Sequence, residues 1–460
     1  MKLPFLNRHE ERARLEKLFA RREGSLGVLF GRRRCGKSRL LYETLSRERS
    51  VLYVGDDQDP ALQRAQLAKE IARLIPGFDE VAYPDWTAVF ARWWREAKRN
   101  SVLVLDEFPS MVSVSSELPS LLQRYVDHQS DRGVDLILAG SSQRMMQGLV
   151  LDASAPLFGR ANEILKISPM SAFWIRKALR LEHDPVTAVE AYSVWGGVPR
   201  YWELATDHPD RQTALSALVY SPLGVLHEEP KRLLMDDLRE TTQVASILSL
   251  IGQGCHRVSE IAARLQKPST SLSRPLQRLI ELELVRREVP LGSSLRSGKR
   301  SLYRISDPFL RYWYRFVEPN LSQLEMRPPN IVLKNTEPHF SHHVAGVWEE
   351  LVRESLLRAP HRGIEWARVG RWWGAGLDRQ PQELDVLAES GSGETLLVGE
   401  VKWEETTDVE RSLARLEKKA SLLPLAKGKK ILLELWVKSA PDGAKSRQVT
   451  TPRRVLEALK

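Results

Sequence analysis

The sequence predicts an α/β protein with a parallel sheet in its first third and further domains behind it. Two observations lead to this fold class. Short apolar runs alternate with longer helical patterns up to about residue 170, which is typical of buried parallel strands joined by helices. A basic string with two glycines directly follows the first of these runs. At about 100–200 residues per domain, the 460 residues correspond to about three domains.

Composition and charge exclude several classes of protein. Hydrophobic residues make up 42% of the chain and charged residues 28%, values near the globular average that exclude a disordered chain. The two cysteines, Cys35 and Cys255, are too few for a disulfide framework, a thiolate zinc site or an iron–sulfur cluster. The net charge of +10 favours a polyanionic partner, either nucleic acid or nucleotide phosphates.

No membrane partner is expected. Charged residues occur within the first few positions, and no apolar segment of a signal peptide follows them. No stretch of about 18 uncharged apolar residues occurs, so no helix is expected to span a bilayer. We therefore expect a cytoplasmic protein.

Residues 1–170 are expected to form the α/β core. Helical patterns, such as those at Arg12–Ala20 and Trp86–Lys98, lie between most of the apolar runs. The expected strands are Leu26–Phe30, Val51–Val54, Val102–Phe108, Leu136–Ala139 and Ile164–Ile167.

A phosphate-binding loop follows the first expected strand. The string fits the pattern G-x-x-x-x-G-K-[ST], in which glycines let backbone N–H groups face a phosphate and the following helix adds its positive end. Lys37 is expected to reach the β- and γ-oxygens, and the Ser38 hydroxyl to ligate Mg²⁺. We interpret Cys35 as filler rather than as a redox switch. The expected nucleotide-binding residues are Gly31, Arg32, Arg33, Arg34, Cys35, Gly36, Lys37, Ser38 and Arg39.

Two carboxylates close the third expected strand and complete the nucleotide site. We expect Asp106 to hold Mg²⁺ through its water shell and Glu107 to polarise the attacking water. Ser141 is either a residue beside the γ-phosphate or a helix cap. Arg160 is either a finger that stabilises charge on the transferred phosphoryl group, in its own chain or a neighbour, or a surface arginine.

Helical segments dominate residues 171–238, and residues 239–306 match a winged helix, because three helical stretches are followed by a basic hairpin. A winged helix binds either DNA or protein, and we favour DNA. The expected contacts come from the recognition helix, which begins at Ser269, and from the loop of the hairpin. They are Ser271, Arg274, Arg278, Arg296, Lys299 and Arg300.

Residues 307–339 form a linker whose aromatic run, Tyr312–Tyr314, we interpret as interdomain core rather than as a base-stacking platform. Residues 340–460 mix helix and strand. Glu400 and Lys402 are two apart on an expected strand and point to the same side, and Asp385 on the partner strand can face them.

These residues resemble the PD-(D/E)XK nuclease pattern, with Glu349 as a supporting acid from the preceding helix. The pattern is short, so two other interpretations stay open. The strands can be a hairpin with a surface ion pair, which contributes little. The domain can also be a nuclease fold that has lost its activity and only binds.

The chain as a whole resembles the archaeal-type P-loop ATPases of the AAA+/STAND group that carry the C-terminal domain of unknown function 234. The family's common form has Tyr where this chain has Ser110. The resemblance implies an α/β P-loop NTPase (AAA+-like) core, a helical lid, a winged-helix domain and an α+β nuclease-like C-terminal domain. It rests on FLNR at residues 5–8, GRRRCGKS, VLDEFPSM, AGSSQRMM, PLFGR, WGGVPRY, YRISDPFLRYWYRF, WEELVRE, WWGAGLDRQPQELDVLAE and GEVKW.

Together, these features predict a molecular switch that binds ATP and Mg²⁺, hydrolyses ATP and acts on DNA. Hydrolysis is expected to change how the lid orients the winged helix and the terminal domain. One alternative is a nucleotide-bound regulatory or scaffold protein with slow or no hydrolysis, and another is an ATP-gated DNA nuclease in genome defence. A homo-oligomer is a further possibility, and it is compatible with Arg160 as a finger and with Arg160 as a surface arginine.

Overall fold

The computed structural model describes residues 3–21, 23–128, 133–237, 241–294, 298, 300–404, 408–439 and 448–460, without the side chains of 151, 236 and 237. The chain divides into two compact units, which are treated separately. The N-terminal unit comprises Asn7–Pro169 and Met235–Arg239, and the C-terminal unit comprises Met1–Leu6, Met170–Leu234 and Glu240–Lys460. Among the helices that the structure describes, none combines the length and apolar character needed to cross a membrane.

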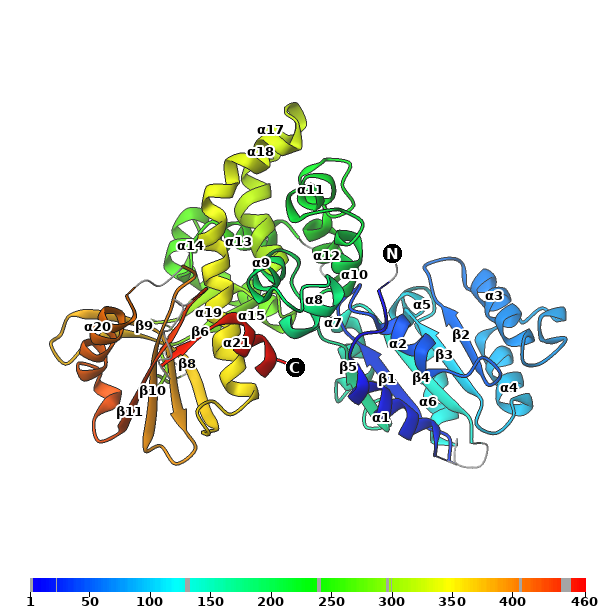
Figure 1. The fold of residues 1–460 in the computed structure, drawn as a ribbon. Coiled ribbons are helices and arrows are strands. Elements are labelled where there is room, and N and C mark those ends of the chain that lie inside the picture. Colours follow the sequence, from blue (N-terminus) through cyan, green and yellow to red (C-terminus); the bar gives the residue numbers. More distant parts are fainter. Residues whose placement is uncertain are drawn as a thin grey trace. The chain divides into compact units, whose positions relative to one another are not determined.

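The N-terminal unit is built on a parallel sheet with the strand order β2-β3-β4-β1-β5 (Figure 1). All residues of β1, β3 and β4 are buried, which explains why these segments are apolar and do not alternate. Because β4 lies between β1 and β3, the segments that follow these three strands meet at one edge of the sheet. The strands are β1 (Leu26–Phe30), β2 (Ser50–Val54), β3 (Val102–Asp106), β4 (Asp135–Gly140) and β5 (Glu163–Lys166).

Helices join these strands and cover the sheet. In the helix from Trp86 to Glu96, the buried side chains include Trp86, Phe90 and Trp93, at the spacing of one helical face. The helices are α1 (His9–Phe19), α2 (Lys37–Thr44), α3 (Pro60–Ala72), α4 (Trp86–Glu96), α5 (Phe108–Val114), α6 (Leu118–Asp127) and α7 (Gln143–Met146). A short 3-10 helix, η1, spans Phe78–Glu80, and a short π-helix, η3, spans Gln147–Leu151.

A buried carboxyl group lies at the first residue of β4. Asp135 is 2% exposed, and its Oδ1 accepts a hydrogen bond from the Ser25 backbone N–H at 2.9 Å. Burial raises the pKa of Asp135 to about 7, although the hydrogen bonds from Ser25 act in the opposite direction. A carboxyl whose pKa is raised by folding binds its proton more tightly in the folded state. The contribution of Asp135 to stability is therefore greatest in acid and is lost as the pH rises from about 4 to 7.

Asp135→Asn is expected to stabilise the protein at pH 8 by on the order of 2 kcal/mol, because the amide stays neutral and its oxygen still accepts from Ser25. Thermal unfolding at pH 5 and pH 8 measures this, with the exposed Asp57→Asn as the matched control. The advantage of the Asp135 variant over the parent should grow toward pH 8. An equal difference at both pH values would contradict the ionisation of Asp135 as its cause.

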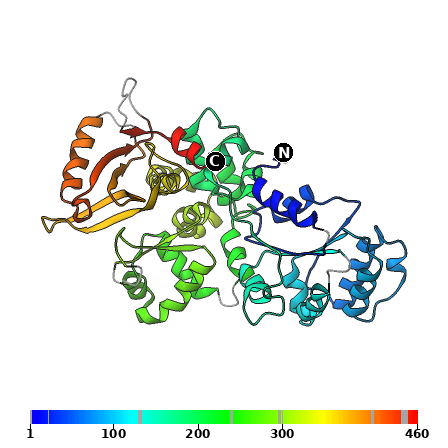
Figure 2. The ribbon, with the colours of Figure 1, turned by 90° about the horizontal axis from the view of Figure 1, so that it is seen from below.

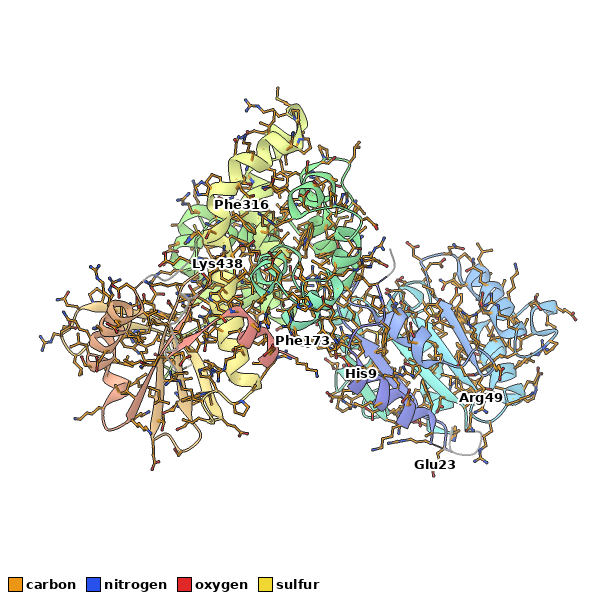
Figure 3. The ribbon with its side chains drawn as sticks, in the orientation of Figure 1. His9, Glu23, Arg49, Phe173, Phe316 and Lys438 are labelled. Carbon is orange, nitrogen blue, oxygen red and sulfur yellow. The ribbon has the colours of Figure 1, made fainter. Side chains whose placement is uncertain are left out.

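The helical segment expected at residues 171–238 lies in the C-terminal unit as far as Leu234. Its helices are α8 (Ala172–Ala178), α9 (Pro185–Trp195), α10 (Pro199–Ala205), α11 (Arg211–Leu215) and α12 (Glu229–Asp237), with a short π-helix η4 (Ser216–Tyr220). Lys438, labelled in Figure 3, pairs with Glu190 of α9 at 3.3 Å. This ion pair connects the helical segment to the C-terminal sheet of the same unit.

Three helices and a two-stranded antiparallel sheet follow in the order expected for residues 239–306. They are α13 (Thr242–Gly252), α14 (Val258–Leu265), the turn η5 (Ser269–Leu272), α15 (Ser273–Glu281), β6 (Val285–Glu288) and β7 (Leu302–Ile305). The next elements are α16 (Pro308–Tyr312), η6 (Trp313–Val317), η7 (Glu318–Asn320), α17 (Leu321–Met326), α18 (Pro329–Thr336) and η8 (Glu337–His339). Tyr312, Trp313 and Tyr314 are buried, which confirms that the aromatic run is core.

The C-terminal sheet has the strand order β12-β11-β10-β9-β8, with β8, β9 and β10 antiparallel and β10, β11 and β12 parallel. Helix α19 (Phe340–Arg358) lies against one face and α20 (Val409–Ser421) against the other (Figures 1 and 2). The remaining elements are β8 (Trp366–Ala375), β9 (Pro381–Ser390), β10 (Thr395–Val401), η9 (Pro424–Ala426), β11 (Lys430–Trp436), β12 (Val449–Thr450) and α21 (Pro452–Ala458).

Candidate functional site

The phosphate loop runs from the end of β1 to the start of α2. Gly31 has φ +149°, and a Cβ at this position would lie 2.3 Å from the backbone oxygen of Ile167. Since a backbone oxygen cannot move aside as a side chain does, only glycine fits here. Gly36 has φ +94°, with open space where a Cβ would stand. The loop therefore combines a start that only glycine fits with open space at Gly36, directly before α2.

Lys37 is the first residue of α2, and its side chain turns back into the loop. Its Nζ donates hydrogen bonds to the carbonyl oxygens of Gly31 at 2.7 Å and Arg32 at 3.3 Å. Burial lowers the pKa of Lys37, while the negative charge of Glu107 acts in the opposite direction. A phosphate beside Nζ would add further negative charge and stabilise the ammonium.

The Ser38 hydroxyl donates a hydrogen bond to Oδ2 of Asp106 at 2.7 Å, so the two residues expected to hold Mg²⁺ are in contact. Asp106 is 2% exposed, and its Oδ1 accepts from the backbone N–H of Glu107. A hydroxyl and a carboxylate beside a phosphate loop are hard oxygen donors of the kind that Mg²⁺ prefers. The residues present therefore fit this ion.

Glu107 adopts a left-handed backbone conformation with φ +51° between β3 and α5. Its Oε2 accepts hydrogen bonds from the backbone N–H of Ser141 at 3.1 Å and from the Ser141 hydroxyl at 2.8 Å. A left-handed conformation at a non-glycine residue costs free energy and is common at functional sites. These contacts bring the ends of β3 and β4 together and hold the Glu107 carboxylate in one place.

Arg8 is a residue of this site that the sequence interpretation missed. It is 5% exposed, has φ +67°, and donates hydrogen bonds from Nη2 to the carbonyl oxygens of Cys35 and Ser168. Arg8 thus connects the phosphate loop to the segment that follows β5. The FLNR string at residues 5–8 was the sequence feature that could have identified it. Cys35 itself is fully buried, which agrees with its interpretation as filler.

The other arginines of the loop differ in exposure. Arg33 is exposed, whereas Arg32 and Arg34 are half-buried. Arg39, on the first turn of α2, forms an ion pair of 3.8 Å with Glu43. Arg39 is thus engaged within its own helix.

Within its own chain, Arg160 lies away from the phosphate loop and from Asp106 and Glu107. It forms two hydrogen bonds with the Asp127 carboxylate, at 2.6 and 3.1 Å. Two residues further on, Asn162 accepts a hydrogen bond from the backbone N–H of Leu26, the first residue of β1. Arg160 therefore lies at the edge where the parallel strands begin, and the phosphate loop lies at the edge where they end. The length of β1 thus separates Arg160 from the phosphate loop of its own chain, which leaves a finger from a neighbouring chain and a surface arginine as the interpretations that stay open.

The acidic residues of the C-terminal unit gather around Asp385 of β9. The Oδ2 of Asp385 accepts a hydrogen bond from the Val401 backbone N–H at 3.0 Å. Burial, together with the negative charges of Glu349 and Glu400, raises the pKa of Asp385 to about 6. Lys402 Nζ lies 3.6 Å from Glu400, so these two side chains point to the same side, as expected.

Two arginines that the sequence interpretation missed lie within this acidic group. Arg353 Nη1 donates to the Asp385 carbonyl oxygen at 2.8 Å and lies 3.5 Å from Glu349, and Arg371 Nε lies 3.8 Å from the same Glu349 carboxylate. Within the described ranges, no group of three or more His, Cys, Asp or Glu is arranged to hold a metal ion. The positive charges of Arg353 and Arg371 already balance the negative charge of Glu349 that would attract a cation. These residues therefore do not fit a metal centre formed by several carboxylates.

The predicted nucleic-acid residues on the third helix form a polar face. Leu272, Leu276 and Leu279 are buried, while Ser271 and Arg274 are exposed and Arg278 is half-buried. Arg300, next to β7, is exposed. Arg296 and Lys299 lie outside the described residues.

Comparison with protein families identifies two regions. Residues 5–204 match a family described as an ATPase domain predominantly from Archaea. Residues 313–414 match DUF234, described as archaeal and bacterial proteins of unknown function.

Three proteins similar to this chain are matched over most of its length. An uncharacterized protein of Methanocaldococcus jannaschii is 28% identical over 435 residues, which cover 92% of this chain and 93% of that protein. The Walker-type ATPase PABY2304 of Pyrococcus abyssi has 20% identity and a TM-score of 0.52, and the match covers 68% of this chain and 96% of that one. The ORC2 protein of Aeropyrum pernix, in its ADPNP–ADP complexes, has 15% identity and a TM-score of 0.44, covering 71% and 96%.

Proposed function

Because the chain is an ATPase with a domain of the predominantly archaeal type and a DUF234 region, we propose that it is an Mg-ATP-driven switch whose partner is DNA. The observation that carries the catalytic part is the meeting of Lys37, the Ser38–Asp106 pair and the Glu107–Ser141 pair at one edge of the sheet. These residues follow β1, β3 and β4, which lie side by side.

Each residue has a distinct role in the proposed hydrolysis. The loop N–H groups and Lys37 bind the phosphates and stabilise the charge that develops on them. Ser38 and Asp106 would hold Mg²⁺, which would supply positive charge to neutralise the phosphates. Glu107 accepts a proton from the attacking water, and Ser141 keeps its carboxylate in place.

Arg160 enters this proposal only through a second copy of the chain. Its Asp127 partner is 40% exposed, so the ion pair is accessible to solvent and can exchange partners at little cost. In an oligomer, an arginine from one copy could then reach the phosphates bound by another.

The proposed DNA-binding element is the winged helix of α13, α14, α15, β6 and β7. Its support is the polar side of η5 and α15, on which Ser271 and Arg274 are exposed while the leucines of the same elements are buried. Arginines on such a helix can contact phosphates or base edges in a major groove. The chain's net charge of +10 has the sign that this interaction needs.

The double variant Arg274→Ala/Arg278→Ala tests this part. For the parent, we expect the affinity for duplex DNA to fall steeply with salt. If both arginines contact phosphates, the double variant should lower the slope of log K against log salt by about 2. Fluorescence anisotropy of a labelled duplex over a salt series measures this, with Arg73→Ala, a 75%-exposed side chain at the end of α3, as control. A parent whose binding does not depend on salt would favour the protein-contact interpretation.

A nuclease activity at Asp385 is a second candidate. The gathering of Glu349, Asp385 and Glu400 favours it, and the ion pairs of Arg353 and Arg371 with Glu349 oppose it.

A further inference from the structure

A cavity of about 490 Å³ lies between the C-terminal sheet and the segment formed by the end of β6 and the start of the loop that follows it. Its walls are residues 287–293, residues 368–371 of the edge strand β8, and Arg353 of α19. All of these segments belong to the C-terminal unit. A volume of this size is typical of a site for a small ligand or for one group of a larger one.

The walls of the cavity are strongly cationic. Four of the described lining side chains are arginines, namely 287, 353, 368 and 371, and one, Glu288, is a carboxylate. Arg368 also pairs with Glu389 at 3.2 Å outside the lining. Arginine presents a planar fork of donors that matches phosphate and carboxylate oxygens. The charge of the lining therefore selects anions.

Arg371 is the most buried of these arginines, and two of its nitrogen atoms lack a hydrogen-bond acceptor. It is 8% exposed and pairs with Glu383, yet its Nε and Nη1 atoms donate no hydrogen bond. The nearest carboxylate oxygens, on Glu349 and Glu288, are 3.8 and 3.6 Å away, within range of an ion pair but too far for a hydrogen bond. Arg371 therefore adds a largely buried positive charge to this wall of the cavity.

The cavity is held open by backbone contacts. The Leu291 backbone N–H donates to the Arg371 carbonyl oxygen at 2.8 Å, which fixes the segment after β6 onto the free edge of β8. Gly292 has φ +85°, and its neighbour across the cavity wall is Leu425, 3.1 Å from a Cβ at this position. Because the walls are already in place, little ordering is needed when an anion binds.

Ion pairs join the hairpin to α19 behind the cavity. Glu350 of α19 contacts Arg286 of β6 and also Arg311, the latter at 2.8 Å. Burial raises the pKa of Glu350, but these two arginines more than offset this effect and hold it below its ordinary value. The hairpin and α19 are thus joined through ionised groups at neutral pH.

We propose that this cavity binds a phosphodiester group of a nucleic-acid strand that continues from the winged helix towards the C-terminal sheet. The inference rests on the proposed DNA function and deepens it. On this proposal, the DUF234 region is a second part of the chain that contacts nucleic acid, and its arginines bind the phosphate. Arg353 lines the cavity and also contacts the Asp385 carbonyl, so a strand held here would lie next to the acidic group.

The double variant Arg287→Gln/Arg368→Gln tests the proposal, because both side chains are exposed and the buried Arg371 stays in place. The matched control is Arg415→Gln, an exposed arginine on α20 outside the cavity lining. The probe is a labelled single-stranded oligonucleotide of mixed sequence. We expect an affinity about 10-fold lower than in the parent and a salt slope lower by about 1 to 1.5. Unchanged thermal unfolding would show that the fold is intact.

The other outcomes separate the two proposals. If the parent binds DNA and only the Arg274/Arg278 variant loses affinity, the cavity assignment is overturned and the DNA function stands. If the parent binds no DNA, both are overturned. If inorganic phosphate or AMP binds in a way that depends on Arg287 and Arg368 while the oligonucleotide does not bind, the cavity takes a free phosphate compound and the strand assignment is wrong.

A denaturing gel of the same DNA, incubated with Mg²⁺ or Mn²⁺, distinguishes binding from cleavage. We expect the strand to stay intact, because Arg353 and Arg371 neutralise Glu349. Cleavage that disappears in Asp385→Asn would overturn the assignment of this region as a contact that only binds.

Discussion

Lys37→Ala is expected to lower ATP hydrolysis by about 10²- to 10³-fold or more, since it removes a buried ammonium group that lies inside the phosphate loop and donates hydrogen bonds to the Gly31 and Arg32 carbonyls. The lysine stabilises charge on the transferred phosphoryl group at a buried position, where water screens it little. Phosphate release at saturating Mg-ATP measures the loss.

The control for this prediction is Lys69→Ala, which removes an exposed lysine from α3. It should leave turnover unchanged. Thermal unfolding should show that the Lys37 variant is folded, since removing a group whose charge is disfavoured by burial relieves a desolvation cost. Turnover that persists in a folded Lys37→Ala protein would mean that the hydrolytic site lies elsewhere.

Glu107→Gln should lower turnover by about 10²- to 10⁴-fold while the protein still binds ATP. The amide of glutamine can accept the hydrogen bonds from Ser141, so the geometry at the end of β3 is kept, but it cannot accept a proton from water. Steady-state turnover and the binding of a fluorescent ATP analogue together separate the two effects.

Glu117→Gln, at the exposed start of α6, is the matched control for this change. Equal loss of binding and turnover in Glu107→Gln would assign Glu107 to nucleotide binding rather than to proton transfer. A parent protein without measurable turnover would favour the alternative of a nucleotide-bound scaffold.

The order of elements was largely predictable, because it depends on local patterns. The expected strand Leu26–Phe30 is confirmed as β1, and the expected strand Ile164–Ile167 is shifted by one residue relative to β5. The first helix starts at His9 rather than at Arg12, because Asn7 and Arg8 take left-handed conformations that no periodicity reveals.

The nucleotide site was predictable for a related reason. Its residues directly follow apolar strands, and parallel strands of one sheet end at the same edge. Once the sheet was predicted, Lys37, Asp106 and Glu107 were expected to meet. The hydrogen bond from Ser38 to Asp106 and the effect of the Glu107 charge on the pKa of Lys37 agree with this. Arg160 carries no such constraint, since it follows a loop rather than a strand.

The sequence by itself determined the strands, most helices and the phosphate loop, since each depends on residues a few positions apart. Only the tertiary structure decided which distant charges meet. Arg353 and Arg371 sit among the carboxylates around Asp385, and Arg8 holds a loop 27 residues away. Such pairs depend on how the strands and helices pack, and a long arginine side chain can reach partners in several directions. No local spacing encodes that choice.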